Sequence, residues 1–189
     1  MSESSLHEHA LDNIRFIRDA MERAGSFTSI PGWGGVIIGV TAAICAAVAH
    51  GYGATRAWLW IWLGEAGVAA VIGLITMTRK GREAGTSLNS PAARRFFVSY
   101  AAPLVTGAIL TFVLQPAQLP GIWLLLYGTS FVSSGAFSIR VVPVMGICFM
   151  TLGAIACFVP FAVANALLGV GFGGLHIIFG WIIARRFGG

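Results

Sequence analysis

Six apolar stretches follow one another along the chain, separated by short polar links. They cover residues 32–50, 57–77, 96–114, 121–138, 141–159 and 162–184. Each stretch is close to the ~20 residues that an α-helix needs to cross the hydrocarbon core of a bilayer. The sequence therefore predicts an all-α, polytopic transmembrane bundle of six helices.

The basic residues lie almost entirely on one side of these stretches. Eleven of the twelve fall before the first stretch, between the second and third, between the fourth and fifth, or after the sixth. These eleven are Arg15, Arg18, Arg23, Arg79, Lys80, Arg82, Arg94, Arg95, Arg140, Arg185 and Arg186. Only Arg56 lies on the opposite side. Because cytoplasmic loops carry an excess of Lys and Arg, we expect an inner-membrane type of protein with both termini in the cytoplasm.

The composition excludes a water-soluble fold. The chain is 57% hydrophobic and 10% charged, whereas about a quarter of the residues of a soluble domain are charged. The net charge of +5 does not indicate nucleic-acid binding, because the positive residues line the predicted cytoplasmic edge, where anionic lipid headgroups attract them. The lipid bilayer is the expected partner, and no nucleic acid is expected.

Residues 1–31 are predicted to form a cytoplasmic amphipathic helix and a hinge, and residues 32–189 the transmembrane domain. Ser5 and Glu8 have capping-box spacing, and apolar residues recur at helical spacing across 5–24. These apolar residues are Leu6, Ala10, Ile14, Ile17 and Met21. The opposite face carries both signs of charge, so this helix is expected to lie against the bundle, or against a cytoplasmic or membrane partner protein.

Two ionisable residues, Glu65 and His176, lie well inside the predicted spans. Such residues are costly in hydrocarbon, at about 2.5 to 3.5 kcal/mol on insertion scales, and they usually face protein or water. His176 shares a helical face with small residues that allow close helix packing. The residues predicted to pack helices, within one bundle or in a homo-oligomer, are Gly35, Gly39, Gly169, Gly173 and Gly180.

A polar path through the bundle is one interpretation of the remaining polar residues. Counted at 1.5 Å per residue, Glu65 and His176 differ in depth by about 8 Å, too far for a direct hydrogen bond. Tyr127, Ser130 and Ser134 share a stripe that would join them, and Arg140 would close it on the cytoplasmic side. In the alternative interpretation, Glu65 is a neutral hydrogen-bond donor, His176 is satisfied between helices, and Arg140 serves topology alone.

The sequence carries none of the motifs that mark common enzymes. There is no HExxH zinc site, Gly-x-Ser-x-Gly elbow, Walker loop or CxxCH haem attachment. Cys45, Cys148 and Cys157 all lie inside predicted spans, which argues against a disulfide framework. We therefore expect no enzyme activity, no cofactor and no metal.

Three segments resemble a family of small six-span membrane proteins of bacteria with no assigned activity. They are HALDNIRFIRDAMERAGSF near the N-terminus, LPGIWLLLYGTSFVSSGAFSIRVVPVM at residues 119–145, and GGLHIIFGWIIARRFGG at residues 173–189. The resemblance covers about a third of the chain and implies a bacterial origin, without implying an activity, a substrate or a site.

Two functions remain open from the sequence. The first is a small ion or proton-coupled solute transporter or channel that uses the polar path. The second is a membrane anchor, sensor or accessory subunit that acts through helix contacts and the N-terminal helix. In the first, Glu65 and His176 are sensitive to substitution; in the second, Ile14, Ile17 and Met21 are.

Overall fold

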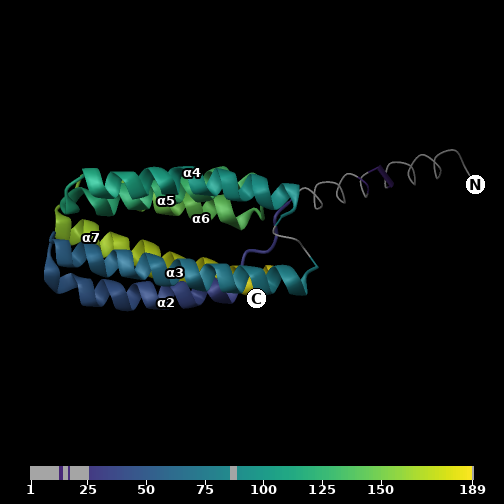
Figure 1. Cartoon of the computed structure of the whole chain (residues 1–189), viewed down its shortest axis with the longest axis horizontal. Helices are drawn as coiled ribbons and strands as arrows, with labels where there is room; N and C mark the ends of the chain where they lie inside the picture. Colours follow the sequence, from purple (N-terminus) through teal and green to yellow (C-terminus); the bar gives the residue numbers. More distant parts are fainter. Residues whose placement is uncertain (1–12, 15–16, 18–25, 86–88, 189) are drawn as a thin grey trace, which may run out of the picture.

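The described residues form helices joined by short links. The computed structural model describes residues 13–14, 17, 26–85 and 89–188 (Figure 1). The helices are α2 (Gly32–Ala49), α3 (Arg56–Glu83), α4 (Pro91–Val113), α5 (Leu119–Gly135), α6 (Val141–Ala156), α7 (Phe161–Gly169) and α8 (His176–Phe187). Short 3-10 turns, η1 (His50–Tyr52) and η2 (Pro116–Gln118), follow α2 and precede α5. The predicted all-α class is confirmed for this part of the chain.

A π-helical turn joins the last two helices. It is η3 (Val170–Leu175), and it makes Phe161–Phe187 one continuous helix. Three of its six residues are glycines, and glycine weakens the regular helix because it has the most conformational freedom to lose. Such π-turns are rare and occur mostly as single turns within α-helices, often at functional sites. This turn ends directly before His176.

Among the described residues, four helices are long and apolar enough to cross a membrane: Gly32–Tyr52, Arg56–Glu83, Pro91–Val113 and Phe161–Phe187. α5 and α6 are shorter, with 17 and 16 residues. α6 ends before the predicted residue 159 because Pro160 follows, and the residue before a proline disfavours helical geometry. The helices fit a membrane protein, and the count of six spans remains a prediction.

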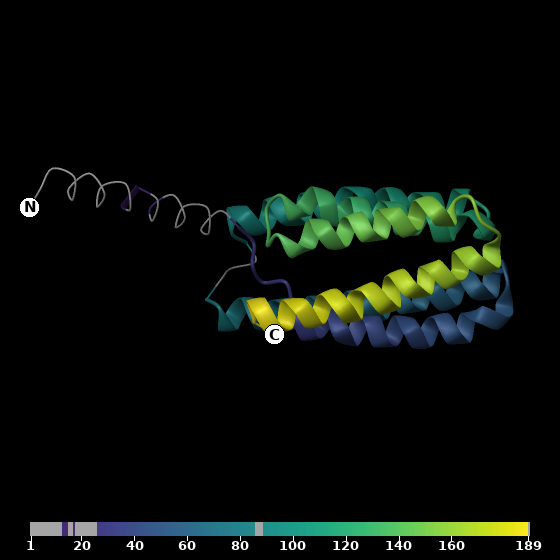
Figure 2. The same ribbon diagram turned by 180° about the vertical axis from the view of Figure 1, so that it is seen from behind.

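The helices form two layers, which are seen from opposite sides in Figure 1 and Figure 2. One layer contains α2, α3 and α8, and the other contains α4, α5 and α6. α7 runs obliquely between the layers. It contacts α2 of the first layer and α5 and α6 of the second. The outer surface of both layers is apolar, with side chains such as Ile44 of α2 and Phe112 of α4 exposed by 60% and 76%.

Glycines allow the closest helix pairs. In the first layer, Gly35 and Gly39 of α2 face Gly180 and Gly173 of the last helix, and Gly169 faces Ala46. A Cβ built at Gly39 or Gly180 would come within 2.7 Å of the opposite backbone. The five glycines singled out by the sequence are thus used where α2 meets the last helix, and this face is not free for a second copy of the chain.

The hinge at residues 26–31 crosses from one layer to the other. The backbone N–H of Phe27 donates to the carbonyl of Phe137 at 2.7 Å, and the Ser138 hydroxyl donates to the carbonyl of Phe27 at 2.7 Å. On the other side, the Lys80 ammonium donates to the carbonyl of Ile30 at 2.9 Å. It also donates to the carbonyls of Phe187 and Gly188. The hinge is therefore fastened to both layers at the end of the bundle where the last helix finishes.

Most of the predicted N-terminal helix lies outside the described residues. Of residues 5–24 the structure describes only Asn13, Ile14 and Ile17, which are helical and exposed. Ser5, Glu8 and Met21 are among the residues that it does not describe. The amphipathic helix and its contacts stay a prediction.

Candidate functional site

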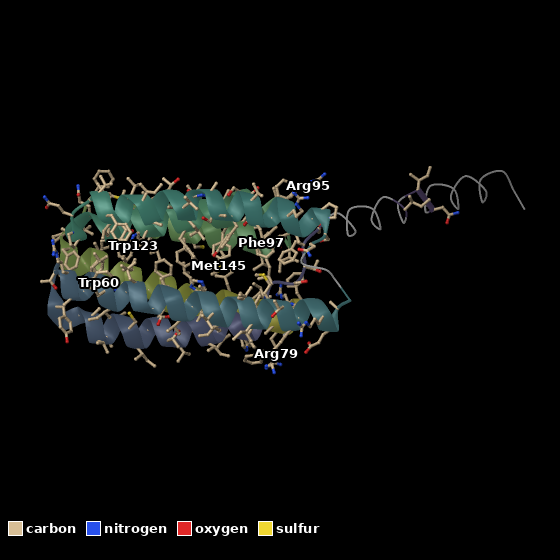
Figure 3. The ribbon with its side chains drawn as sticks, in the orientation of Figure 1. Trp60, Arg79, Arg95, Phe97, Trp123 and Met145 are labelled. Atoms are coloured by element: carbon tan, nitrogen blue, oxygen red, sulfur yellow. The ribbon has the colours of Figure 1, made fainter. Side chains whose placement is uncertain are left out.

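A cavity of about 560 Å³ lies between the two layers. Its walls include the stretches of α3 from Trp62 to Met77 and of α4 from Phe96 to Thr111. Figure 3 shows Phe97, Trp123 and Met145, three of the lining residues, between the layers. The volume is within the range of about 300–1,000 Å³ that is usual for ligand pockets. The lining is mostly apolar, and the predicted residues Glu65, Tyr127 and His176 are among its few polar members.

Glu65 lines the cavity from α3 and is held by a threonine of α2. The Thr41 hydroxyl oxygen lies 2.8 Å from Glu65 Oε1 and 2.9 Å from the carbonyl oxygen of Ile38. A hydroxyl has a single proton to donate. Both contacts are full hydrogen bonds when Glu65 carries its own proton and donates it to Thr41, which in turn donates to Ile38. The geometry therefore suits a neutral carboxylic acid that borders the cavity.

Tyr127 and His176 form the opposite polar wall. His176 Nδ1 lies 2.9 Å from the carbonyl oxygen of Phe172, which can only accept, so Nδ1 carries the proton. In the neutral imidazole Nε2 is then an acceptor, and the Tyr127 hydroxyl donates to it at 2.8 Å. Because η3 ends at Leu175, the π-turn places the Phe172 carbonyl beneath this ring. The local backbone thus selects one tautomer and one orientation of His176.

An aromatic cluster surrounds this pair. The Tyr127 ring centroid lies 4.9 Å from Phe131, 5.0 Å from Phe149 and 4.8 Å from Phe172. Tyr100 of α4 adds a ring at 6.3 Å. Aromatic pairs of this spacing add stability beyond their buried area. The cluster holds the polar pair in a water-poor setting at the border of the cavity.

Each end of the cavity is covered by aromatic side chains. At the end near the hinge, Phe27 is buried against Phe96 and Phe97, with ring centroids 4.8 and 5.4 Å away. At the far end, Trp58 stacks on Trp123 at 5.5 Å. The Trp58 indole donates to Asn165 Oδ1 at 2.8 Å, and the Trp123 indole donates to Thr111 Oγ1 at 2.9 Å. These bonds fix the two indoles as a cap over the far end.

The structure does not bring the other residues of the predicted polar path to the cavity. Ser130 and Ser134 are fully buried, and their hydroxyls donate to the backbone carbonyls of Leu126 and Ser130 on their own helix. Arg140 is exposed and precedes α6. A hydroxyl that donates to the preceding turn of its own helix is already satisfied, so the burial of these serines requires no further polar partner. The polar groups at the cavity therefore form two separate sites, one around Glu65 and one around His176.

Several residues of the site were not singled out by the sequence. Thr41 and Asn165 are uncharged, whereas the predicted site was built on ionisable residues. A lone Asn inside a span is nevertheless a signal, because an unsatisfied amide is costly in hydrocarbon. Tryptophans are typical of the membrane boundary, yet Trp58 and Trp62 are exposed by only 0% and 4% and turn into the bundle, whereas Trp60 is 65% exposed.

Comparison of the chain with protein-family models, curated proteins and solved structures found no match. The resemblance to a bacterial six-span family therefore stays a prediction.

The cavity combines two chemical capacities. Its apolar walls can hold an apolar molecule without loss of hydrogen bonds. Glu65 on one wall and His176 on the other are groups that can take up or release a proton. The arrangement suits reversible binding of a small molecule that is linked to a change of protonation.

Proposed function

We propose that the chain is a six-span integral membrane protein that moves a small solute across the bilayer through this cavity, in exchange for or together with protons. The proposal rests on one observation, that Glu65, Tyr127 and His176 border a single cavity of ligand size between the layers. In hydrocarbon, an ionisable side chain is retained mainly where it faces a cavity or serves a function. The apolar surface and the lengths of four helices support placement in a membrane.

The proposed topology places α5 and α6 across the membrane beside α4. α5 packs along α4, and α6 packs along α5. The two shorter helices therefore lie beside α4, which is long enough to span the membrane. Arg79 and Arg95 lie near the end of the bundle where Figure 1 marks the C-terminus, and Trp60 lies near the opposite end (Figure 3). With the positive end inside, both termini are cytoplasmic in a bacterial inner membrane.

This topology predicts that Cys157 is reachable from outside the cell. Cys157 is exposed after the last residue of α6, whereas Cys45 is buried and Cys148 is half-buried within helices. A membrane-impermeant maleimide applied to intact spheroplasts is expected to label the wild type and to leave Cys157→Ser unlabelled. Labelling that appears only after the membrane is opened would place this turn in the cytoplasm and would contradict the topology.

Transport predicts that Glu65→Gln abolishes proton flux in liposomes that carry the purified protein under an imposed pH gradient. Glutamine keeps the size and the hydrogen-bonding capacity of the side chain but cannot exchange a proton. Glu83→Gln is the matched control, because Glu83 is an exposed carboxyl at the end of the same helix. We expect wild-type flux from that variant.

An accessory subunit is the second candidate function. It is favoured by the exposure of Ile14 and Ile17, at 61% and 56%, in the N-terminal segment. In that case Ile14→Asp together with Ile17→Asp releases a partner that co-purifies with the wild type, while Glu65→Gln keeps it. Transport predicts the reverse: proton flux is lost with Glu65→Gln and is kept when Ile14 and Ile17 are replaced by aspartate.

A further inference from the structure

The cavity is covered at both ends but not along one side. Phe27 covers one end and the Trp58–Trp123 pair covers the other. Between these ends, α3 and α4 are not packed against each other in the part of the chain that the structure describes. Ala70 of α3 and Ala108 of α4 line the cavity and are exposed. Residues of this kind mark a rim, so the cavity opens sideways between α3 and α4.

In a membrane this opening faces lipid and not water. Side chains that flank it point to the same conclusion, because Leu74 of α3 and Val105 of α4 are apolar and exposed by 62% and 57%. A molecule that enters here comes from the hydrocarbon core of the bilayer. An ion or a sugar would have to leave its hydration shell before reaching the opening, at a large cost.

The cavity is elongated along the helices. Trp62 and Met77 both line it from α3, and fifteen helical residues correspond to roughly 22 Å. The hydrocarbon core is about 30 Å thick, so a groove of this length can take up much of one hydrocarbon chain. Apolar lining residues continue along it, among them Met145, Phe97 and Ile183.

The polar groups gather toward the end of the groove near Trp62. Glu65 is one turn from Trp62, and Tyr127 is one turn from Trp123. Trp62 also borders the cavity with an indole N–H that is buried without an acceptor among the described residues, unlike the indoles of Trp58 and Trp123. A buried donor without a partner is uncommon and calls for an explanation. A ligand oxygen in the cavity is one acceptor that would satisfy it.

From these features we infer that the cavity binds a single-chain amphiphile of the membrane, with an uncharged oxygen-bearing end of the long-chain alcohol type, which enters between α3 and α4. The apolar chain lies along Met145 and Met77, and the oxygen lies near Glu65 and Trp62. A charged headgroup is disfavoured, because no Lys or Arg lines the cavity in the described chain. The inference rests on the proposed function in that it takes this cavity as the solute site, and it names the class of solute.

The test uses a long-chain alcohol that carries a photoreactive diazirine on its chain, added to liposomes that contain the full-length protein. After illumination, labelled residues are mapped by mass spectrometry. Met145 is the diagnostic residue, because it lines the cavity and is only 5% exposed. Phe112, which is 76% exposed on the outer surface, reports the surrounding lipid. We expect label on both residues in the wild type.

A bulky side chain at the rim distinguishes a probe that enters the cavity from a probe that touches only the outer surface. Ala108→Trp and Ala70→Trp, made separately, are expected to lose the label on Met145 and to keep it on Phe112, which also shows that the variant remains inserted. The control is Ile109→Trp, on the outer face of α4 where Ile109 is 60% exposed, and it should keep both labels. Label confined to surface residues in the wild type, or label on Met145 that persists in both rim variants, would overturn the inference.

Binding and transport fail in different ways in these experiments. Glu65-dependent proton flux without label on Met145 would retain transport and reject the amphiphile. Label on Met145 that is lost in the rim variants, without any proton flux, would support the amphiphile site and reject transport.

Discussion

Replacing Gly146 by leucine is expected to destabilise the folded protein by about 3 kcal/mol or more, near or above the upper end of the usual range for overpacked sites. α5 and α6 meet here backbone to backbone. A Cβ at Gly146 would lie 2.7 Å from the carbonyl oxygen of Gly128 and 2.8 Å from the backbone nitrogen of Val132. Backbone atoms within a helix cannot move aside singly, so the two helices have to separate. Thermal unfolding of the detergent-solubilised protein, followed by near-ultraviolet circular dichroism, measures the loss.

Gly64→Leu is the matched control. A Cβ at Gly64 meets nothing within 4 Å, and the residue is exposed on α3. Leucine is also a better helix former than glycine, by somewhat less than about 1 kcal/mol. We therefore expect this variant to be at least as stable as the wild type. Equal stability of the two leucine variants would show that α5 and α6 do not pack closely at Gly146.

Tyr127→Ala is expected to cost about 3–5 kcal/mol of stability, as is usual when a large aromatic side chain is removed from a core. The ring contacts Phe131, Phe149 and Phe172. Its hydroxyl is the donor to His176 Nε2. Alanine removes both the ring packing and the hydrogen bond, and it leaves a void between α5 and the last helix. Equilibrium unfolding in mixed micelles measures the free energy.

Tyr127→Phe separates these two contributions. Phenylalanine keeps the ring and leaves the buried Nε2 of His176 without its donor, which is expected to cost about 1–3 kcal/mol. Tyr52→Ala is the control, because Tyr52 is 48% exposed in the link after α2, and a change within about 0.5 kcal/mol is expected there. A Tyr127→Phe variant as stable as the wild type would contradict the hydrogen bond to His176.

The helices were largely predictable because their signals are local. Hydropathy marks each apolar run, but α4 begins at Pro91, five residues before the predicted stretch at residue 96, and there the Ser90 hydroxyl accepts from the N–H of Ala93. The ends were less predictable. α3 continues through Lys80 to Glu83, because charged residues with long apolar stems are good helix formers even where the apolar run stops.

The pairing of helices was not predictable from the same signals. The glycines of α2 indicate a close neighbour, but nothing in their spacing says that this neighbour is the last helix of the chain. Trp58 and Trp62 carry the composition of a membrane-boundary belt, yet Asn165 binds the first indole inside the bundle. Which face of a uniformly apolar helix meets protein depends on which helices pack against it. The hydropathy along the sequence does not identify those neighbouring helices.

The candidate site was predicted in part. Glu65, Tyr127 and His176 were singled out because polar groups in hydrocarbon need a reason, and all three border the cavity. Ser130 and Ser134 share a helical stripe with Tyr127, but a serine can satisfy its hydroxyl within its own helix, so spacing alone does not distinguish a path from local bonding. The cavity itself arises from the separation of α3 and α4, which no local pattern records.

The measurement that tests the account most directly is proton flux into liposomes under an imposed pH gradient, with the wild type, Glu65→Gln and Glu83→Gln reconstituted at equal density. Transport through this cavity predicts flux with the wild type and Glu83→Gln, and its loss with Glu65→Gln. Folded wild-type protein that gives no flux, or Glu65→Gln that conducts as well as the wild type, would contradict transport through this cavity.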